Sequence, residues 1–354
     1  MYQVKTVTEK EFDDFLALPK RINSKQTLMQ KPAEELALLK GEHTLSKYFT
    51  FTAFICYRDT KTVSRCAVTI YHDSGEAYLG FFESINNDAA AKAVMDAADS
   101  FAKQKGIKKL TGPVDASFWL SYRMKSNCFD EPRDFGEPYG LPYYPDLWKK
   151  NGYTIAETYV STVYKKLSTK DNDDEKYLKR YNFLRKKGYR IVSAEKSQWD
   201  RQLHEVYHLL IDLYSDFPVF SFITEEDFCE MYKDLRSILD FSMVKLAYKN
   251  GRLLGFMISI PDYSNKLNGK IGLPQILSIL KNRHFCKRFV ILYVGVDRKH
   301  LGLGSALVQC EFKQLCKRGA VAIGALIKKG KVTERYLENI ILYKKEYVLF
   351  EKTL

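Results

Sequence analysis

The sequence lacks the patterns of a secreted or membrane-embedded chain. Its seven cysteines include no Cys-x-x-Cys pair, and an odd, scattered set is not typical of a disulfide framework. Long hydrophobic runs are also missing, since the stretch 289–296 falls far short of the ~20 residues that a membrane helix needs. The first residues lack the apolar core of a signal peptide. We therefore predict a cytoplasmic protein with no membrane span.

Two common phosphate-binding signatures are absent as well. The chain has no P-loop signature, which argues against a P-loop NTPase. The pair Gly302 and Gly304 lacks the third glycine and the later acidic residue of a dinucleotide-binding fold.

The composition is typical of a globular protein large enough for two cores. Of the 354 residues, 45% are hydrophobic and 28% are charged, so disorder is not expected. At this length two domains of about 150–200 residues are the default expectation. A polar, turn-rich run marks the boundary, and we predict domains at 1–167 and 177–354 joined by a linker at 168–176. The net charge of +13 indicates an anionic partner without distinguishing a nucleotide from nucleic acid or a membrane surface.

Strands and helices alternate in both halves. In the first half we predict strands at 51–57, 65–71, 77–83, 108–112 and 153–163, and helices at 88–105 and 144–150. In the second half we predict helices at 202–214, 225–235 and 305–318, a hairpin over 242–260 that turns at Asn250-Gly251, and strands at 289–296 and 320–326. This order favours an α/β fold of the α+β type, in which helices flank a mixed sheet in each half.

The segment from Phe289 to Val308 is typical of a pyrophosphate-binding turn. An apolar strand runs into a basic turn with two glycines, and an amphipathic helix follows. A helix start leaves about four amide donors unpaired and carries a partial positive charge, and glycines let a phosphate approach those amides closely. Arg298, Lys299 and His300 add positive charge in the turn. The alternative is that the glycines only permit a tight turn between strand and helix.

The segment Lys299-His-Leu-Gly302-Leu-Gly304 resembles the acyl-coenzyme A site of the GNAT N-acetyltransferase superfamily, a strand followed by Arg/Gln-x-x-Gly-x-Gly/Ala at a helix start. It departs from that pattern because Lys299 stands where Arg or Gln is usual and because the turn is one residue shorter. More broadly, the chain is similar over nearly its whole length to bacterial two-domain GNAT-like proteins of undefined function. The segments that carry this similarity are Phe15–Pro19, Gly80–Glu83, Gly112-Pro113, Pro142–Tyr144, Gly255-Phe256, Pro261-Asp262 and Gly295-Val296.

The resemblance implies tandem GNAT-like domains, each with a mixed, mostly antiparallel sheet flanked by helices. The first half is expected to be a degenerate copy, because no glycine pair and no basic residue follow Glu83, and the acidic helix start there repels phosphate. The alternative is that the first half is an unrelated α/β domain. One cofactor per chain is expected.

The resemblance further implies an acyl-coenzyme A-dependent N-acyltransferase that uses acetyl-CoA or another acyl-CoA and a small-molecule amine acceptor. The amine would attack the thioester directly, with an oxyanion donor near Gly295 or Val296. The residues expected to bind the cofactor are Gly295, Val296, Lys299, His300, Leu301, Gly302, Leu303, Gly304 and Ser305. For protonation of the leaving thiolate, Tyr343 is the first candidate and Tyr336 the second, although a tyrosine often only packs through its ring.

Two further features leave alternatives open. Glu225, Glu226 and Asp262 could serve as the general base, or each could be a helix-start or turn carboxylate. The aromatic loop 214–222 could line the acceptor site, or it could seal the core or a domain interface.

A zinc-protease pattern, His204-Glu-Val-Tyr-His208, is also present. The helical period places Leu203, Val206 and Leu210 on the buried face, and it leaves both histidines on the opposite, polar face. No third ligand is evident in the sequence, so we expect no metal.

Two rival functions remain compatible with the sequence. One is a transferase that uses aminoacyl-tRNA, because such enzymes also pair two GNAT-like domains and tend to be basic; apart from that tRNA, nucleic acid is not an expected partner. The other is a non-catalytic scaffold that binds coenzyme A. A homodimer is also compatible with the sequence.

Overall fold

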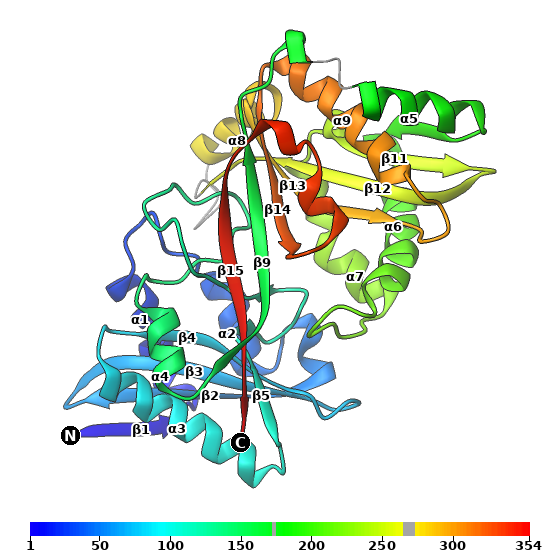
Figure 1. Ribbon diagram of the computed structural model, residues 1–354. Coiled ribbons are helices and arrows are strands. Elements are labelled where there is room, and N and C mark those ends of the chain that lie inside the picture. Colours follow the sequence, from blue (N-terminus) through cyan, green and yellow to red (C-terminus); the bar gives the residue numbers. More distant parts are fainter. Residues whose placement is uncertain (172–174, 265–272) are drawn as a thin grey trace.

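The computed structural model describes residues 1–171, 175–264 and 273–354, so residues 172–174 of the predicted linker lie outside the described residues (Figure 1). The first half contains β1 (Tyr2–Thr6), α1 (Phe12–Ile22), α2 (Pro32–Lys40), β2 (Phe49–Arg58), β3 (Lys61–Tyr71), β4 (Ala77–Ser84), α3 (Asp88–Gln104), β5 (Lys109–Gly112), β6 (Val114–Asp115), β7 (Ser121–Tyr122), β8 (Met124–Lys125), α4 (Tyr144–Lys150) and β9 (Thr154–Tyr164). The second half contains α5 (Glu175–Lys186), β10 (Arg190–Ser193), α6 (Trp199–Tyr214), α7 (Glu225–Tyr232), β11 (Val244–Lys249), β12 (Arg252–Pro261), α8 (Leu273–Phe285), β13 (Arg288–Val296), α9 (Leu303–Arg318), β14 (Val321–Lys328) and β15 (Ile341–Thr353).

Strands from both halves form one 13-stranded sheet among the described residues. The order is β1-β2-β3-β4-β5-β15-β9-β14-β13-β12-β11-β10, and β8 pairs with β15 off this path. The pairs β4–β5 and β13–β14 are parallel, and the other strand pairs of the described chain are antiparallel. The predicted α/β fold with a mixed, mostly antiparallel sheet is therefore confirmed.

Two long strands, β9 and β15, run through both halves of the molecule (Figure 1). Strand β15 pairs with β9 along most of its length, from Ile341 opposite Tyr164 to Glu351 opposite Thr154. Its end also pairs with β5, with Phe350 opposite Gly112. The end of β9 pairs with β14, with Val163 opposite Ile323. The last strand of the chain thus completes the sheet of the first half. The division into two domains with a linker at 168–176 remains a prediction. The sheet runs continuously through both halves.

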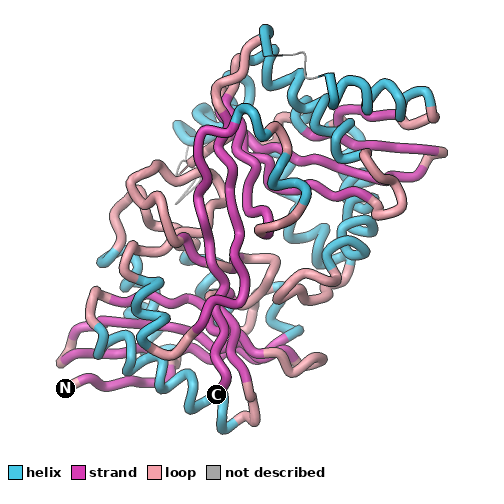
Figure 2. Tube along the Cα trace, in the orientation of Figure 1, coloured by secondary structure: helices cyan, strands magenta, loops and turns pink. Residues whose placement is uncertain are grey.

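Helix α9 shows how the sequence places the second-half core. Val308, Phe312 and Leu315 are buried at the predicted helical spacing. Gly319 ends the helix in a left-handed conformation with φ of 58°, as predicted from its position after the last apolar residue. Figure 2 shows the long paired strands in the middle of the molecule, with helices beside the sheet in both halves.

The long loop between β8 and α4 is fixed by a buried ion network. Lys345 of β15 is fully buried, and its Nζ atom lies 2.6 Å from Asp134 and 3.1 Å from Glu137. Arg288 of β13 contacts the same Asp134 at 2.7 Å, and Lys125 contacts Glu137 at 3.0 Å. Removing one partner would leave buried charges uncompensated. The network therefore holds the loop against β15 and against β13 of the second half.

No helix of the described residues is both long and apolar enough to span a bilayer.

Candidate active site

The parallel strands β13 and β14 separate at the centre of the second half. Their pairing runs from Arg288 opposite Val321 to Ile291 opposite Gly324, although β13 continues to Val296 and β14 to Lys328. The register of β13 against β12 shifts between Tyr293 and Ile291, and the register of β14 against β9 shifts between Gly324 and Ile327. Such bulges bend a strand, so two bulges at the same level explain why the strands diverge.

The turn after β13 exposes a row of backbone amides. Asp297 organises the turn, because its side chain accepts from the Lys299 amide at 2.9 Å and its carbonyl accepts from the His300 amide at 2.9 Å. Gly302 then begins helix α9 with φ of 83°, and no side chain caps the helix. The amides of Leu301, Gly302, Gly304 and Ser305 donate to no other group among the described residues. An uncapped helix start of this kind binds anions.

Each glycine of the turn has a close neighbour that the sequence did not reveal. A Cβ atom on Gly304 would lie 2.4 Å from the hydroxyl of Tyr336. A Cβ atom on Gly302 would lie 2.1 Å from Nε of Arg180, on helix α5. The structure therefore brings Tyr336 and an additional guanidinium to the turn. Arg180 lies more than a hundred positions upstream, within a basic helix that offers no motif, so only the fold identifies it.

The three basic residues of the turn have different partners. Arg298 forms an exposed ion pair with Asp216 at 2.6 Å. His300 shares a hydrogen bond of 2.6 Å with the hydroxyl of Tyr189. Lys299 is exposed and forms no ion pair with a described residue, so its charge remains available beside the free amides.

Gly295 is explained by close packing at the end of β13. It lies opposite Phe256, and a Cβ atom would meet the Phe256 ring at 2.6 Å and Leu213 at 2.9 Å. The next residue, Val296, lies opposite Gly255 and lines the same cavity as Gly295. Both residues therefore lie at the strand end where the sequence predicted an oxyanion donor, and that role stays a prediction.

The two candidate tyrosines lie in different places. Tyr336 lines the cavity beside the turn, and burial raises its pKa above the usual value. Tyr343 lies on β15 and donates to Glu131 at 2.8 Å; burial, followed by this bond, raises its pKa to about 12. Among the described residues Tyr343 does not line the cavity. The structure thus groups Tyr336, and not Tyr343, with the glycine turn.

The predicted base candidates have structural contacts. Asp262 accepts from the amides of Phe135 and Ser264, both at 2.9 Å, and it lies 3.2 Å from Arg288. Glu225 begins α7, and its Oε1 atom lies 2.7 Å from Nδ1 of His204 and 3.1 Å from Nε2 of His208. Among the described residues, neither these two carboxylates nor Glu226 line the cavity.

The zinc-protease pattern lies on the exposed face of α6. Both histidines are exposed, whereas Leu203, Val206 and Leu210 are buried as the helical period predicted. Within the described parts of the chain, no group of three or more His, Cys, Asp or Glu side chains could hold a metal ion.

The equivalent place in the first half is closed. A Cβ atom on Gly80 of β4 would lie 1.9 Å from the carbonyl oxygen of Val114, so the chain after β5 lies directly against β4. Helix α3 is capped by Asn87, whose side chain accepts from the Ala90 amide, and Asp88 occupies its first turn. Asp88 also pairs with Lys150 at 2.7 Å. These contacts leave neither a gap between strands nor an uncapped helix start at this place.

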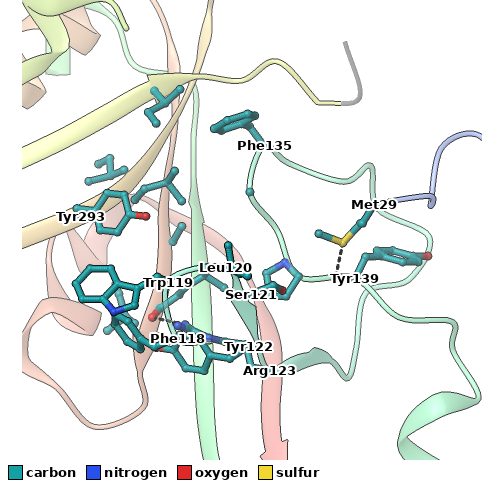
Figure 3. A pocket seen from close by; sticks show the side chains of 18 of the residues that line it. Met29, Phe118, Trp119, Leu120, Ser121, Tyr122, Arg123, Phe135, Tyr139 and Tyr293 are labelled. Atoms are coloured by element: carbon teal, nitrogen blue, oxygen red, sulfur yellow. Dashed lines mark hydrogen bonds between the residues drawn. The ribbon is translucent and has the colours of Figure 1, made fainter. Parts of the chain in front are cut away.

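A large cavity of about 1970 Å³ joins the two halves. Its walls include the β13 end and Tyr336 from the second half, and Phe118, Tyr122 and Arg123 from the first half. Figure 3 shows Phe118, Tyr122 and Arg123 together at one side of this hollow. A typical small-molecule site measures about 300–1,000 Å³, so the space suffices for two ligands.

The aromatic loop 214–222 forms part of this wall and of the contact between the halves. Tyr214 and Phe217 line the cavity. Phe118 of the first half packs on Tyr214 and Phe220 with ring centroids 6.1 and 5.5 Å apart, and Trp119 Nε1 donates to the Ser221 carbonyl at 2.7 Å. The loop therefore seals the interface, as one of the two alternatives predicted.

Comparison with known proteins identifies the fold. No family profile matches the sequence, and no curated protein matches it. Among solved structures, a tandem GNAT protein from the clavulanic acid biosynthesis pathway matches with a TM-score of 0.54 at 11% identity, over 100% of this chain and 98% of that one. A GCN5-related N-acetyltransferase from Sphaerobacter thermophilus matches with a TM-score of 0.51 at 12% identity, over 99% of this chain and 95% of that one.

A third match is the GCN5-related glucosamine N-acetyltransferase region of a fungal multi-domain GH3 β-N-acetylglucosaminidase. Its TM-score is 0.55 at 13% identity, and the match covers 99% of this chain but 38% of that one. The chain therefore has the tandem GNAT fold, as the sequence resemblance predicted. At these identities the likeness concerns the fold, and the activity must be argued from the site.

Proposed function

We propose that the protein is an acyl-CoA-dependent N-acyltransferase, with acetyl-CoA as the first donor to consider and a small-molecule amine as acceptor. The observation that carries the proposal is the uncapped start of α9 beside the gap between β13 and β14. The free amides of Leu301, Gly302, Gly304 and Ser305, with Arg180 and Lys299 nearby, suit the pyrophosphate of coenzyme A. The gap between the strands would receive the pantetheine arm.

The proposed reaction is direct attack of the amine on the thioester carbonyl. A backbone amide at the end of β13 would stabilise the oxyanion, and the cavity walls would hold the acceptor against the thioester. The thiolate needs a proton as it leaves, and Tyr336 both places its hydroxyl against Gly304 of the turn and lines the cavity. Because burial raises its pKa, Tyr336 stays protonated at neutral pH and can act as that acid.

Binding of acetyl-CoA to wild-type protein and to Gly302→Glu tests the site. The substitution places a negative side chain at the phosphate position, so we expect the thermal stabilisation by acetyl-CoA to be lost. For wild type this stabilisation is ~2.7 kcal/mol at about 100 times the dissociation constant. Gly106→Glu is a matched control, because Gly106 also has a positive φ of 78° and no atom within 4 Å of its missing Cβ.

Unchanged acetyl-CoA binding in Gly302→Glu would contradict the proposed site. Binding without turnover over a panel of amines would instead favour the scaffold. Binding of aminoacyl-tRNA that weakens steeply with salt, without an effect of acyl-CoA, would favour the tRNA-dependent transferase.

A further inference from the structure

Arg123 is a buried arginine that faces the cavity from the first half. It lies between β7 and β8, its side chain is 8% exposed, and its backbone has a positive φ of 75°. Figure 3 shows it beside Tyr122 at one side of the hollow, with Phe135 at the opposite side. A residue other than glycine in this backbone region is strained, and such strain is concentrated at functional sites.

The guanidinium group is held in place without a counter-charge. Its central carbon lies 3.7 Å from the centre of the Tyr122 ring and 4.2 Å from that of Tyr159, and Nη1 donates to the Leu326 carbonyl at 2.9 Å. Nε has no hydrogen-bond partner, and no carboxylate of the described residues forms an ion pair with Arg123. By contrast, the buried Arg65 pairs with Glu35 at 2.7 Å.

The tyrosines around Arg123 do not supply the missing negative charge. Burial raises the pKa of Tyr122, Tyr159, Tyr214 and Tyr293 above the usual value, so all four hydroxyls are neutral at physiological pH. A buried charge normally has a partner of opposite sign, since leaving water without one is costly. The uncompensated charge of Arg123 at the cavity wall therefore points to an anionic ligand group in the cavity.

The position of Arg123 identifies which ligand would carry that group. Its partner Leu326 lies within the bulge of β14, where β14 separates from β13, and Leu326 itself has a positive φ of 58°. The helix start that would hold the phosphates follows the far end of β13, after the five further residues Leu292–Val296. Arg123 is thus placed toward the acyl end of the cofactor, where the acceptor must also lie.

We propose that Arg123 binds a carboxylate of the acceptor, so that the substrate is an amine that also carries a carboxylate, such as an amino acid. This inference rests on the proposed acyltransferase function. The two tyrosine rings and the Leu326 carbonyl hold the guanidinium in one position at the cavity wall, where a carboxylate would supply the missing negative charge. The first half would then select the substrate of the second.

The first test uses binding of fragments, with Arg123→Gln compared with wild type. Benzoate, which presents an aromatic ring and a carboxylate, should raise the melting temperature of wild type more than uncharged benzamide does. The difference should vanish in Arg123→Gln. Arg58→Gln, which removes an exposed arginine, is the matched control and should behave as wild type. Equal shifts by benzoate and benzamide in wild type would overturn the proposal.

The second test measures ligand-free unfolding. If Arg123 serves a ligand, Arg123→Gln relieves an uncompensated charge, and its melting temperature should stay within about 2 °C of wild type or rise. A much larger fall would show that the guanidinium is a structural element and would overturn the inference. Acetyl-CoA should stabilise Arg123→Gln as it does wild type. If acetyl-CoA does not raise the melting temperature of wild type, the proposed function is contradicted. If wild type shows no preference for benzoate over benzamide, the role of Arg123 is contradicted.

The third test separates the two sources of a carboxylate. Phenylalanine and phenethylamine are compared as acceptors with acetyl-CoA, and phenethylamine is then assayed with succinyl-CoA. We expect kcat/KM to favour phenylalanine by at least about tenfold in wild type and by little in Arg123→Gln. A preference for succinyl-CoA that depends on Arg123, without a preference for phenylalanine, would assign the carboxylate to the acyl group and overturn the acceptor assignment.

Discussion

The positions of Gly302 and Gly304 each require glycine, but for different physical reasons. Gly302 must adopt a positive φ so that the chain can enter α9 with its amides exposed. Gly304 has an ordinary φ, but a side chain there would strike the hydroxyl of Tyr336. The absence of a side chain at Gly304 therefore leaves room for the Tyr336 hydroxyl beside the proposed cofactor site.

Tyr336→Phe tests that contact at the level of chemistry. We expect kcat to fall by about 10²–10⁴-fold, because the thiolate would lose its proton donor, while acetyl-CoA binding stays unchanged. The raised pKa of Tyr336 keeps the hydroxyl protonated, so the wild-type rate should persist through the neutral and mildly alkaline range. Steady-state kinetics as a function of pH checks both statements. Tyr343→Phe is the matched control, and a larger loss there would transfer the role to Tyr343.

Glu311 of α9 predicts a pH-dependent stability. Its side chain is 1% exposed, and burial raises its pKa to about 7, opposed by Lys245. The folded state therefore binds this proton more tightly than the unfolded state. The resulting stability is fully present below the ordinary pKa of 4.5 and is lost as the pH rises to about 7.

Denaturant unfolding of Glu311→Gln should remove this contribution. Relative to wild type, the variant should gain ~2–3 kcal/mol between about pH 4.5 and 7. The exposed Glu42→Gln should show no such gain. A constant difference between Glu311→Gln and wild type at all pH values would contradict the prediction.

Among the elements that the sequence did not reveal, which include α5 and β10, β15 matters most because it pairs with strands of both halves. Its residues alternate between the faces of a strand, but Lys345 lies on a face that is buried, and its partners Asp134 and Glu137 are about two hundred positions away. A charged residue in the middle of the segment hid the strand pattern, since burial of a lysine cannot be anticipated without its partners. The sequence could predict β2–β5, β9, β11–β14 and α9, because their apolar spacing and terminal glycines are local signals.

The candidate site divides in the same way. The glycine turn was predictable because its chemistry lies in one short segment with a strand before it and a helix after it. Arg180, Arg123 and the preference for Tyr336 were not, since these residues meet the site through tertiary contacts over long sequence separations.

The double role of β15 makes Phe350 a test of coupling between the halves. Phe350 is fully buried and stacks on Trp148 with centroids 5.6 Å apart. Phe350→Ala should lower the free energy of unfolding by about 3–5 kcal/mol while the chain still unfolds in one transition. Urea denaturation followed by circular dichroism measures this. Phe285→Ala, at a residue 73% exposed, should change stability by less than about 0.5 kcal/mol. Two separate transitions would show that the shared strands do not couple the halves.

At the scale of the whole molecule, the two halves share a sheet but differ at the place where a cofactor would bind. In the second half the strands diverge and the helix start is open, whereas in the first half the chain after β5 fills the gap and Asn87 caps the helix. The cavity between them is lined by both halves. This asymmetry fits a division of labour in which one half binds the cofactor and the other shapes the acceptor site.

The same asymmetry predicts one acyl-CoA per chain. Isothermal titration with acetyl-CoA should give a stoichiometry of about one, because only one of the two equivalent helix starts offers free amides among the described residues. Asn87→Gly would remove the cap of α3, but a second site should still not appear, since Asp88 repels phosphate and Val114 occupies the gap. A stoichiometry of two in wild type would contradict this prediction and show that the first half retains a cofactor site. Titration of Gly302→Glu would then give a stoichiometry of one, because only the second-half site would be lost.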